Sequence, residues 1–397
     1  MLLQQPGSRR ESTRSPQSLA SDGWQRRNLV RSLAPLLIAA TALGFAAASV
    51  CAAAQTCTVD RATGTTIDAQ PFRTHAADPQ WNAATNQIAW MAKNSAGYYR
   101  VYIGRPGGTA ARDLTAGIRN MPTKHQGSPW WSPSGRYLLV VAEKPNWHGA
   151  TMFGNLDFGA LPGFGTHDDL WVVTADGSQA WQLTHEPDSK YQGVLVPVFS
   201  ADGRRVAWSD RQGSGKYIIR VADFVTSPVP HLANIRSYQP GGEVYYEPGS
   251  FTTDGRWLLY QSDQDTHSFW HSQIYRLNLA TGQSTRLTQG VQYNEHPVAV
   301  STPSGEWIIY MSTLGVTRRP LHLMLGTEWY AMRLDGSGNK RLTWMNAILP
   351  SNPERSSSPL IAVKATLSPS GTFFLGDVED NIARQSGWIE TVRFTCK

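Results

Sequence analysis

The sequence predicts an all-β fold, a six-bladed β-propeller made of four-stranded antiparallel blades. Its 397 residues include 15 Trp, 14 Tyr, 35 Gly and 24 Pro, and only 17% of them are charged. This composition favours strands and tight turns over helices. A short sequence pattern also recurs at spacings of roughly 50 to 70 residues, which is the period of propeller blades rather than of helical solenoids.

Each copy of the pattern contains a turn followed by a strongly apolar run. The clearest copy is "SPWWSPSGRYLLVVAEK", residues 128–144. Within its turn, Pro presets φ, Ser can bond its own backbone, and Gly accepts a positive φ. The run that follows is apolar on both faces, so we expect a strand buried between two neighbouring blades. Five further copies occur at residues 78–92, 196–210, 249–263, 300–312 and 365–377.

Every copy continues with a second strand-like run, a turn and a short segment that often ends in Leu-Thr. In residues 274–279 polar and apolar side chains alternate, which indicates a half-exposed third strand. One unit is therefore a four-stranded sheet, and stacking such sheets around an axis buries both of their faces. Six copies predict six blades, with seven blades as the alternative.

The two ends of the propeller segment are incomplete in a complementary way. The last copy ends after its third strand, in "GWIETVRFTCK", while "TCTVDRATGTTIDAQPF" precedes the first copy. We predict that the early segment supplies the outer strand of the last blade and closes the ring. Cys57 and Cys396 would then meet. In an oxidising compartment, two cysteines so placed predict a disulfide.

Residues 1–54 have the layout of a secretory signal peptide. They carry six Arg and two acidic residues, then an uncharged apolar stretch and the small residues Ala52, Ala53 and Ala54. The pair Arg26 and Arg27 also resembles a twin-arginine export signal. An uncleaved membrane anchor is the alternative. We expect residues 55–397 to form a single domain that is periplasmic or secreted, without stable membrane insertion after cleavage.

The positive net charge of the chain gives no argument for nucleic-acid binding. The formal net charge is +6, and residues 1–54 contribute four of these charges. The remainder is close to neutral, whereas a nucleic-acid-binding domain carries a basic face. We therefore predict no nucleic-acid partner.

The repeat resembles that of a known family. The run Pro-x-Phe-Ser-x-Asp-Gly at residues 197–203, a following strand and a later Arg-Leu-Thr resemble the repeat of the TolB-like propellers. The repeat is also similar to the propeller domains of prolyl-oligopeptidase relatives and to oligogalacturonate lyases. The resemblance covers about residues 66–395 and is informative for fold rather than for function. It implies the propeller portion only, because residues 55–78 leave no room for the α/β domain that precedes the propeller in TolB.

Polar residues near the start of the innermost strands are the first candidate site. Several of these strands begin with a residue followed by Pro, and residues that enter such a strand tend to line the axial channel. The candidates for binding at the channel mouth are Asp78, Glu243, Glu247, Glu295 and His296. Carboxylates and an imidazole together can hold a divalent cation, bind a polar ligand or act as acid and base. A hydrated funnel with satisfied polar groups is the alternative.

A long insertion in the second blade, residues 144–169, is the second candidate site. It is rich in Gly and aromatic residues, and its candidate binding residues are Trp147, His148, His167 and Asp168. Aromatic packing on the propeller rim is the alternative. Smaller insertions at residues 263–272 and 314–328 would lie on the same side of the ring, which makes that side the expected recognition face.

The sequence thus predicts a monomeric exported binding or scaffolding module for a protein partner or a cell-envelope glycan. It predicts no cofactor other than a divalent cation at the channel mouth, and we assign no metal ligands and no catalytic residues. The alternative is a carbohydrate-active enzyme, either a metal-dependent uronate lyase or a glycoside hydrolase, with its site at the same mouth. No Gly-x-Ser-x-Gly motif accompanies the blades, which argues against a serine peptidase.

Overall fold

The computed structural model describes residues 57–58, 72–107, 110–145, 161–189, 191–316, 325–346, 359–381 and 386–396. The chain divides into two compact units, Met1–Cys51 and Ala52–Lys397, and every described residue belongs to the second unit. Within these described ranges, no helix has the length and apolar character needed to cross a membrane.

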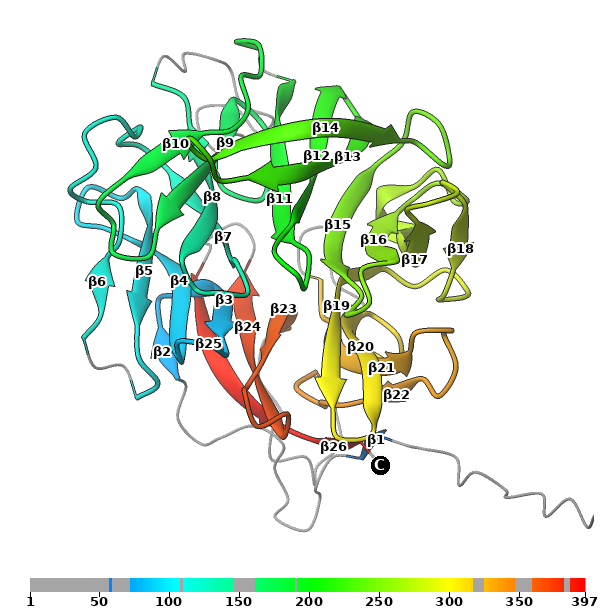
Figure 1. The fold of residues 1–397 in the computed structure, drawn as a ribbon. Coiled ribbons are helices and arrows are strands. Elements are labelled where there is room, and N and C mark those ends of the chain that lie inside the picture. The colour runs from blue at the N-terminus through cyan, green and yellow to red at the C-terminus, as the bar shows by residue number, and fades with distance from the viewer. Residues whose placement is uncertain are drawn as a thin grey trace, which may run out of the picture. The chain divides into compact units, whose positions relative to one another are not determined.

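Six four-stranded antiparallel sheets surround a common axis (Figure 1). The first blade consists of β3 (Ala77–Asn82), β4 (Gln87–Lys93), β5 (Tyr99–Gly104) and β6 (Arg112–Asp113). The second consists of β7 (Gln126–Trp131), β8 (Tyr137–Glu143), β9 (Asp168–Thr174) and β10 (Ala180–Gln182). The third consists of β11 (Gln192–Phe199), β12 (Arg205–Gly213), β13 (Lys216–Val225) and β14 (His231–Tyr238).

The next two blades consist of β15 (Tyr246–Phe251), β16 (Trp257–Ser262), β17 (Gln273–Asn278) and β18 (Ser284–Arg286); and β19 (Asn294–Thr302), β20 (Gly305–Ser312), β21 (Glu328–Arg333) and β22 (Lys340–Arg341). The sixth contains β23 (Ile361–Leu367), β24 (Phe373–Asn381) and β25 (Ser386–Arg393), and its outer strand is β2 (Arg73–Thr74). The described residues therefore form six blades, and the seven-blade alternative is wrong.

The N-terminal part of the propeller segment closes the ring, as the sequence predicts, but the strand that does so is different. The outer strand of the sixth blade is Arg73–Thr74, which pairs with Ile389 and Trp388 and directly follows the predicted segment 56–72. Cys57 does not begin this outer strand. A separate two-stranded ladder joins β1 (Cys57–Thr58) to β26 (Thr395–Cys396), and its register places Cys57 opposite Cys396.

The core lies between neighbouring blades. In β8 the apolar residues from Leu138 to Ala142 are all buried, as expected for a strand sandwiched between two sheets. Trp131, Phe199 and Phe251 occupy equivalent positions at the ends of their first strands and are 3–5% exposed. These aromatic residues therefore belong to the core rather than to a surface site.

The innermost strand of every blade contains a register shift. In four blades it falls at an X-Pro pair whose first residue has a positive φ: Asp78, Ser128, Val196 and His296. Pro suits a bulge because it has no N–H to offer to the ladder. In the fourth blade Pro248 still pairs with Tyr260, and the unpaired residue is Gly249.

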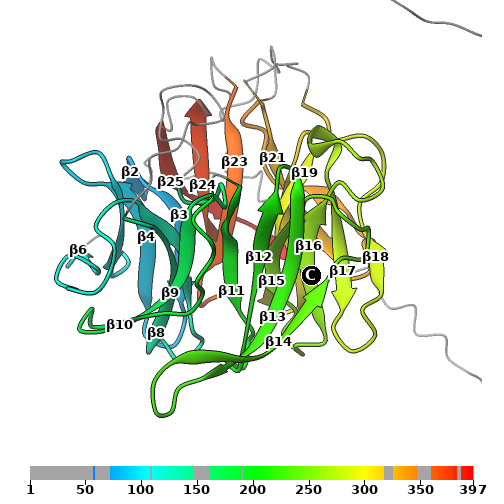
Figure 2. The same ribbon diagram turned by 90° about the horizontal axis from the view of Figure 1, so that it is seen from above.

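One face of the ring collects the features relevant to binding. Because adjacent strands are antiparallel, the first strands begin on the same face at which second and third strands are connected. We call this the loop face. In Figure 2 the strands run from one face of the ring to the other. The loop face receives the starts of β3, β15 and β19 and the connection 263–272 between β16 and β17.

Candidate functional site

The centre of the candidate site is an imidazole held between two carboxylates. Glu247 comes from β15, and Glu295 and His296 come from β19. Nδ1 of His296 lies 3.0 Å from Oε1 of Glu247, and Nε2 lies 3.6 Å from Oε2 of Glu295. The three side chains are 4–12% exposed, with His296 and Glu295 the more accessible. We call these three residues the axial triad.

Neighbouring side chains fix the axial triad in place. The side-chain amide of Gln261 donates to Oε1 of Glu295 at 2.5 Å, and its oxygen accepts the backbone N–H of His296 at 2.9 Å. The hydroxyl of Tyr245 donates to Oε2 of Glu247. The fourth and fifth blades thus position the triad jointly.

The environment drives the pKa values of the two glutamates apart. Burial raises the pKa of Glu295, and the charge of Glu247 adds to that effect although His296 opposes it. Burial also raises the pKa of Glu247, but His296, Lys364 and the hydroxyl of Tyr245 outweigh it and leave the pKa below its usual value. For His296 the carboxylates of Glu295 and Glu247 outweigh burial, so its pKa is raised. These shifts favour the charged forms of His296 and Glu247 and the neutral form of Glu295.

A second acidic group adjoins the axial triad. Nζ of Lys364, on β23, lies 3.0 Å from Oδ1 of Asp78, and the backbone N–H of Asp78 donates to Oδ2 of Asp377 at 3.0 Å. Burial raises the pKa of Asp377 well above its usual value and that of Glu379 to about 7. Glu379 interacts electrostatically with His296 and Glu295, so both groups form one cluster around the axis.

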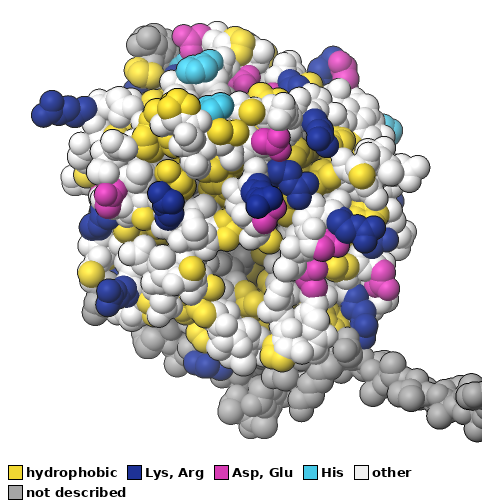
Figure 3. All heavy atoms as spheres, in the orientation of Figure 1, with side chains coloured by type: hydrophobic (Ala, Val, Ile, Leu, Met, Phe, Trp, Pro, Cys, Tyr) yellow, Lys and Arg dark blue, Asp and Glu magenta, His cyan; other side chains and the backbone are white. Residues whose placement is uncertain are grey.

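This axial cluster has an excess of acidic groups. Five carboxyl groups, those of Asp78, Glu247, Glu295, Asp377 and Glu379, face two basic groups, Lys364 and His296. The molecular surface, by comparison, carries charges of both signs. On the face in Figure 3, Lys and Arg side chains are scattered, with Asp and Glu side chains between them.

The residues predicted for the channel mouth do not all lie in one place. Glu247, Glu295 and His296 lie together, and Asp78 lies in the adjoining acidic group. Glu243 stands apart, because its side chain is 66% exposed and pairs with Lys216.

In the long insertion of the second blade, His167 and Asp168 are 2% and 1% exposed. Oδ1 of Asp168 accepts the backbone N–H of Val194, which ties the second blade to the third. Trp147 and His148 lie outside the described residues.

Sequence reasoning missed Lys364, Asp377 and Glu379. The sixth blade has no X-Pro pair in its first strand, so the signal used for the other blades is absent there. A charged residue within the apolar run "IAVKATL" was the available signal for Lys364. Asp377 and Glu379 lie on β24, the second strand of the sixth blade. The repeat pattern gave no sign that side chains on a second strand would lie near the axis.

Exposed aromatic rings lie beside the axial triad. The short 3₁₀ helix η2 (Phe269–His271) presents Phe269 and Trp270, which are 38% and 50% exposed. The Phe269 ring is 5.0 Å from that of Tyr245, and the Trp270 ring is 5.9 Å from that of Tyr293, measured between centroids. Tyr245 and Tyr293 hydrogen-bond in turn to Glu247 and Glu295.

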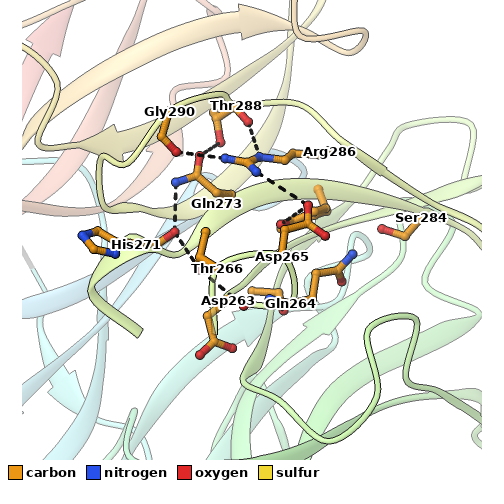
Figure 4. Close-up of polar contacts among 12 residues, drawn as sticks. Asp263, Gln264, Asp265, Thr266, His271, Gln273, Ser284, Arg286, Thr288 and Gly290 are labelled. Atoms are coloured by element: carbon orange, nitrogen blue, oxygen red, sulfur yellow. Dashed lines mark hydrogen bonds and ion pairs between the residues drawn. The ribbon is translucent and has the colours of Figure 1, made fainter. Parts of the chain in front are cut away.

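A polar network holds the loop that carries η2 (Figure 4). The carbonyl of His271 accepts the side-chain amide of Gln273 at 2.9 Å, and the Thr288 hydroxyl donates to the other end of that amide. Asp265 accepts the hydroxyl of Tyr275 at 2.9 Å and lies 3.7 Å from Arg286. The aromatic rings are thus presented by an anchored loop.

A polar pocket of about 420 Å³ lies further out on the second blade, beside the start of the long insertion. Its lining includes Lys144, Asp169, Glu186 and Asp188. Burial and the charge of Asp210 raise the pKa of Glu186 to about 7. The ammonium group of Lys144 donates to the backbone carbonyls of Glu186 and Pro187 and lies 3.7 Å from Asp169. This group therefore already has partners within the protein.

No family model matches this chain. Over 152 residues it is 30% identical to "Tricorn protease homolog 1" of Streptomyces coelicolor, a match that covers 37% of this chain and 13% of that protein. The chain thus spans a small part of this curated relative.

Solved structures resemble the chain over most of its length. TolB from Acinetobacter baumannii is 15% identical, with 79% of this chain and 64% of that chain covered and a TM-score of 0.45. The fold itself is a six-bladed β-propeller. The sialidase of Trypanosoma rangeli is 9% identical, with 81% of this chain and 55% of that chain covered and a TM-score of 0.51. At these identities the likeness concerns the fold alone.

Proposed function

We propose that this TolB-like propeller is an exported binding or scaffolding module whose loop face contacts a protein partner or a cell-envelope glycan. The observation that carries the proposal is the combination, on one face, of exposed Phe269 and Trp270 with the acidic axial cluster. Aromatic side chains are enriched among the residues that carry binding energy in protein interfaces.

The proposal includes the expected fate of the chain. Residues 1–54 act as a signal peptide, and residues 55–397 form one monomeric domain in the periplasm or outside the cell. Cys57 and Cys396 form a disulfide there, which the opposed register of β1 and β26 supports.

Crosslinking in intact cells tests the binding function. Exported protein carrying a photoreactive residue at position 291, beside the loop face, is crosslinked and its partners are identified by mass spectrometry. We expect crosslinks that disappear when Phe269 and Trp270 are both changed to Ala, and that persist with Ile235→Ala, an exposed apolar residue on β14. Crosslinks that survive the double change would contradict the assignment of the loop face.

We also propose that the axial triad binds a divalent cation. One ligand atom from each of Glu247, Glu295 and His296 lies within 4.8 Å of the others, and two carboxylates with an imidazole suit Zn²⁺ or Mn²⁺. Calorimetry with each metal should give one site in the parent protein and none in Glu295→Gln. Equal metal binding by both proteins would disprove it.

A carbohydrate-active enzyme is the second candidate. The opposite pKa shifts of Glu247 and Glu295 favour it, because an acid and a base need such a separation. Release of reducing ends or of unsaturated uronates from oligosaccharides, abolished by Glu295→Gln, is the expected result. Absence of turnover with neutral, amino and uronate oligomers would leave the binding role alone.

A further inference from the structure

A cleft at the rim of the second blade forms a separate candidate site. The polar pocket of about 420 Å³ described above adjoins a pocket of about 330 Å³, and Lys144, Asp169 and Gln182 line both. Residues 119–122, in the connection from the first blade, line the smaller pocket. We call the two pockets together the rim cleft. Its volume lies in the range of small-molecule binding sites.

The smaller pocket has a largely apolar lining. Met121, Ala142 and Trp171 are buried side chains that border it, and Pro122 and Pro145 also line it. A ligand that covers these side chains removes apolar surface from water, which favours binding. The smaller pocket therefore suits the apolar body of a small molecule.

Basic groups outnumber acidic groups in this pocket. Arg119 and Lys144 line it with one carboxyl group, that of Asp169, so the balance is positive even when Asp169 is ionised. Lys144 already has partners within the protein, whereas Arg119 has no hydrogen-bond or ion-pair partner among the described residues. A guanidinium is always charged, and its paired N–H groups match the two oxygens of a carboxylate. Arg119 is thus available to pair with an anionic group.

A buried donor beside the same pocket lacks an acceptor. The indole N–H of Trp171 makes no hydrogen bond within the part of the chain that the structure describes, and the residue is 6% exposed. Buried polar groups are normally hydrogen-bonded. An indole N–H can only donate, so a ligand that satisfies it has to bring an acceptor.

The larger pocket gives the ligand a direction. Asp169, Glu186 and Asp188 line it, and the Asp188 side chain is 67% exposed. An anionic group of the ligand is therefore less favourable there than beside Arg119. Carboxyl groups accept hydrogen bonds in either protonation state, so hydroxyl or amide donors of a longer ligand can extend into the larger pocket.

We propose that the rim cleft binds a small carboxylic acid with an apolar body, its carboxylate paired with Arg119 and its apolar body against Met121 and Trp171. This site goes beyond the proposed function, because its lining comes from the second blade and the adjoining connections rather than from the fourth and fifth blades. Its selectivity requires that the negative charge and the apolar body belong to one molecule.

Calorimetry with four small probes at physiological salt tests this proposal on the full-length exported protein. The probes are 3-phenylpropanoate, the neutral 3-phenylpropanamide, the cationic 3-phenylpropylammonium, and acetate, which has the charge without the apolar body. We expect 3-phenylpropanoate to bind at least about tenfold more tightly than each of the other three.

Variants localise the binding. Arg119→Gln should weaken 3-phenylpropanoate binding by about tenfold or more and abolish the preference for the acid over the amide. Arg105→Gln, at an exposed arginine after the end of β5, is the matched control and should change neither. Trp171→Phe keeps a ring in the pocket but removes the N–H, and should weaken binding about threefold. Because Arg119 is exposed, a thermal melt of Arg119→Gln should match that of the parent protein, which separates lost binding from lost folding.

The adverse results differ in what they overturn. Equal binding of the acid and the amide would disprove the selection for negative charge. Binding of the acid that is indifferent to Arg119→Gln would disprove the assigned site, and indifference to Trp171→Phe would disprove the role of the indole N–H. If none of the probes binds, the proposal for the rim cleft fails, while crosslinking that depends on Phe269 and Trp270 tests the proposed function separately.

Discussion

At the residue scale, the site depends on the balance between burial and charge. His296 lies between Glu247 and Glu295, so its protonated form is favoured even though it is largely buried. Removing one member of such a group leaves uncompensated charge in a poorly solvated place. The triad is therefore a local weakness of the fold as well as its candidate binding centre.

His296→Gln should destabilise the protein in a pH-dependent way. The folded pKa of His296 is raised, so its contribution is fully present below 6.5 and disappears as the pH rises through the folded value. The folded pKa of Glu247 is lowered, so its contribution requires a pH above about 4.5. Between pH 4.5 and pH 6.5 we expect the substitution to lower the free energy of unfolding by about 3 kcal/mol.

Chemical denaturation of both proteins at pH 6 and pH 9 measures this difference. The gap between parent and variant should be clearly smaller at pH 9. His231→Gln, at an exposed histidine on β14, serves as the control and should change stability by less than about 0.5 kcal/mol at either pH. A gap that grows toward pH 9 would contradict the assigned charge of His296.

Gly249→Ala should damage the fold for a steric reason. An added Cβ would lie 1.9 Å from the carbonyl oxygen of Pro297 in the next blade, which is backbone and cannot move aside cheaply. We expect a loss of about 3 kcal/mol or more in unfolding free energy. Gly117→Ala, where nothing lies within 4 Å of the added atom, should be tolerated. Equal urea midpoints for the two variants would refute the argument.

At the element scale, the sequence was most informative where the repeat is strongest. The six blades were predicted from the turn residues and the apolar second strands. The X-Pro pairs at the starts of first strands predicted that Glu247, Glu295 and His296 lie together. Each depends on local chemistry that recurs from blade to blade. The same reasoning placed Glu243 at the mouth, but the side chain is at the surface with Lys216, because short-range position does not fix side-chain direction.

The contacts between blades could not be predicted in this way. Lys364 reaches Asp78 across 286 positions of sequence, and no repeat position encodes such a pairing. The aromatic pair Phe269 and Trp270 lies in an insertion, whose conformation depends on the network around Asp265 and Gln273 rather than on the blade pattern.

Asp265→Ala should loosen the loop that carries η2. It removes the acceptor of the Tyr275 hydroxyl, a contact worth about 1 kcal/mol. Hydrogen exchange of residues 264–272 should become faster while the rest of the fourth blade stays protected. Asp335→Ala, in a surface turn of the fifth blade, is the control. Unchanged exchange in residues 264–272 would mean that other contacts suffice to hold the loop.

At the scale of the whole molecule, stability depends on closing the ring. Each blade buries its faces on two neighbours, so an open ring would expose the core at both ends. Two short ladders prevent this, β2 on β25 and β1 on β26. Both join the beginning of the propeller to its end.

A disulfide between Cys57 and Cys396 should stabilise the closed ring. By the loop-entropy model, a bridge across so long a loop contributes up to about 5 kcal/mol. We expect Cys57→Ser combined with Cys396→Ser to lower the melting temperature, and a reducing agent to lower that of the parent protein alone. Non-reducing peptide mapping gives the direct answer, and two free thiols would disprove the bridge.

The pairing of β2 with β25 has a consequence for the order of the chain. Since the first and last segments are neighbours within one blade, the ring itself has no structural beginning. A gene that fuses the two ends and opens between the second and third blades would encode the same set of neighbouring strands. The order of the blades along the chain therefore depends only on where the termini lie. A circularly permuted chain should keep the same loop face and the same axial cluster.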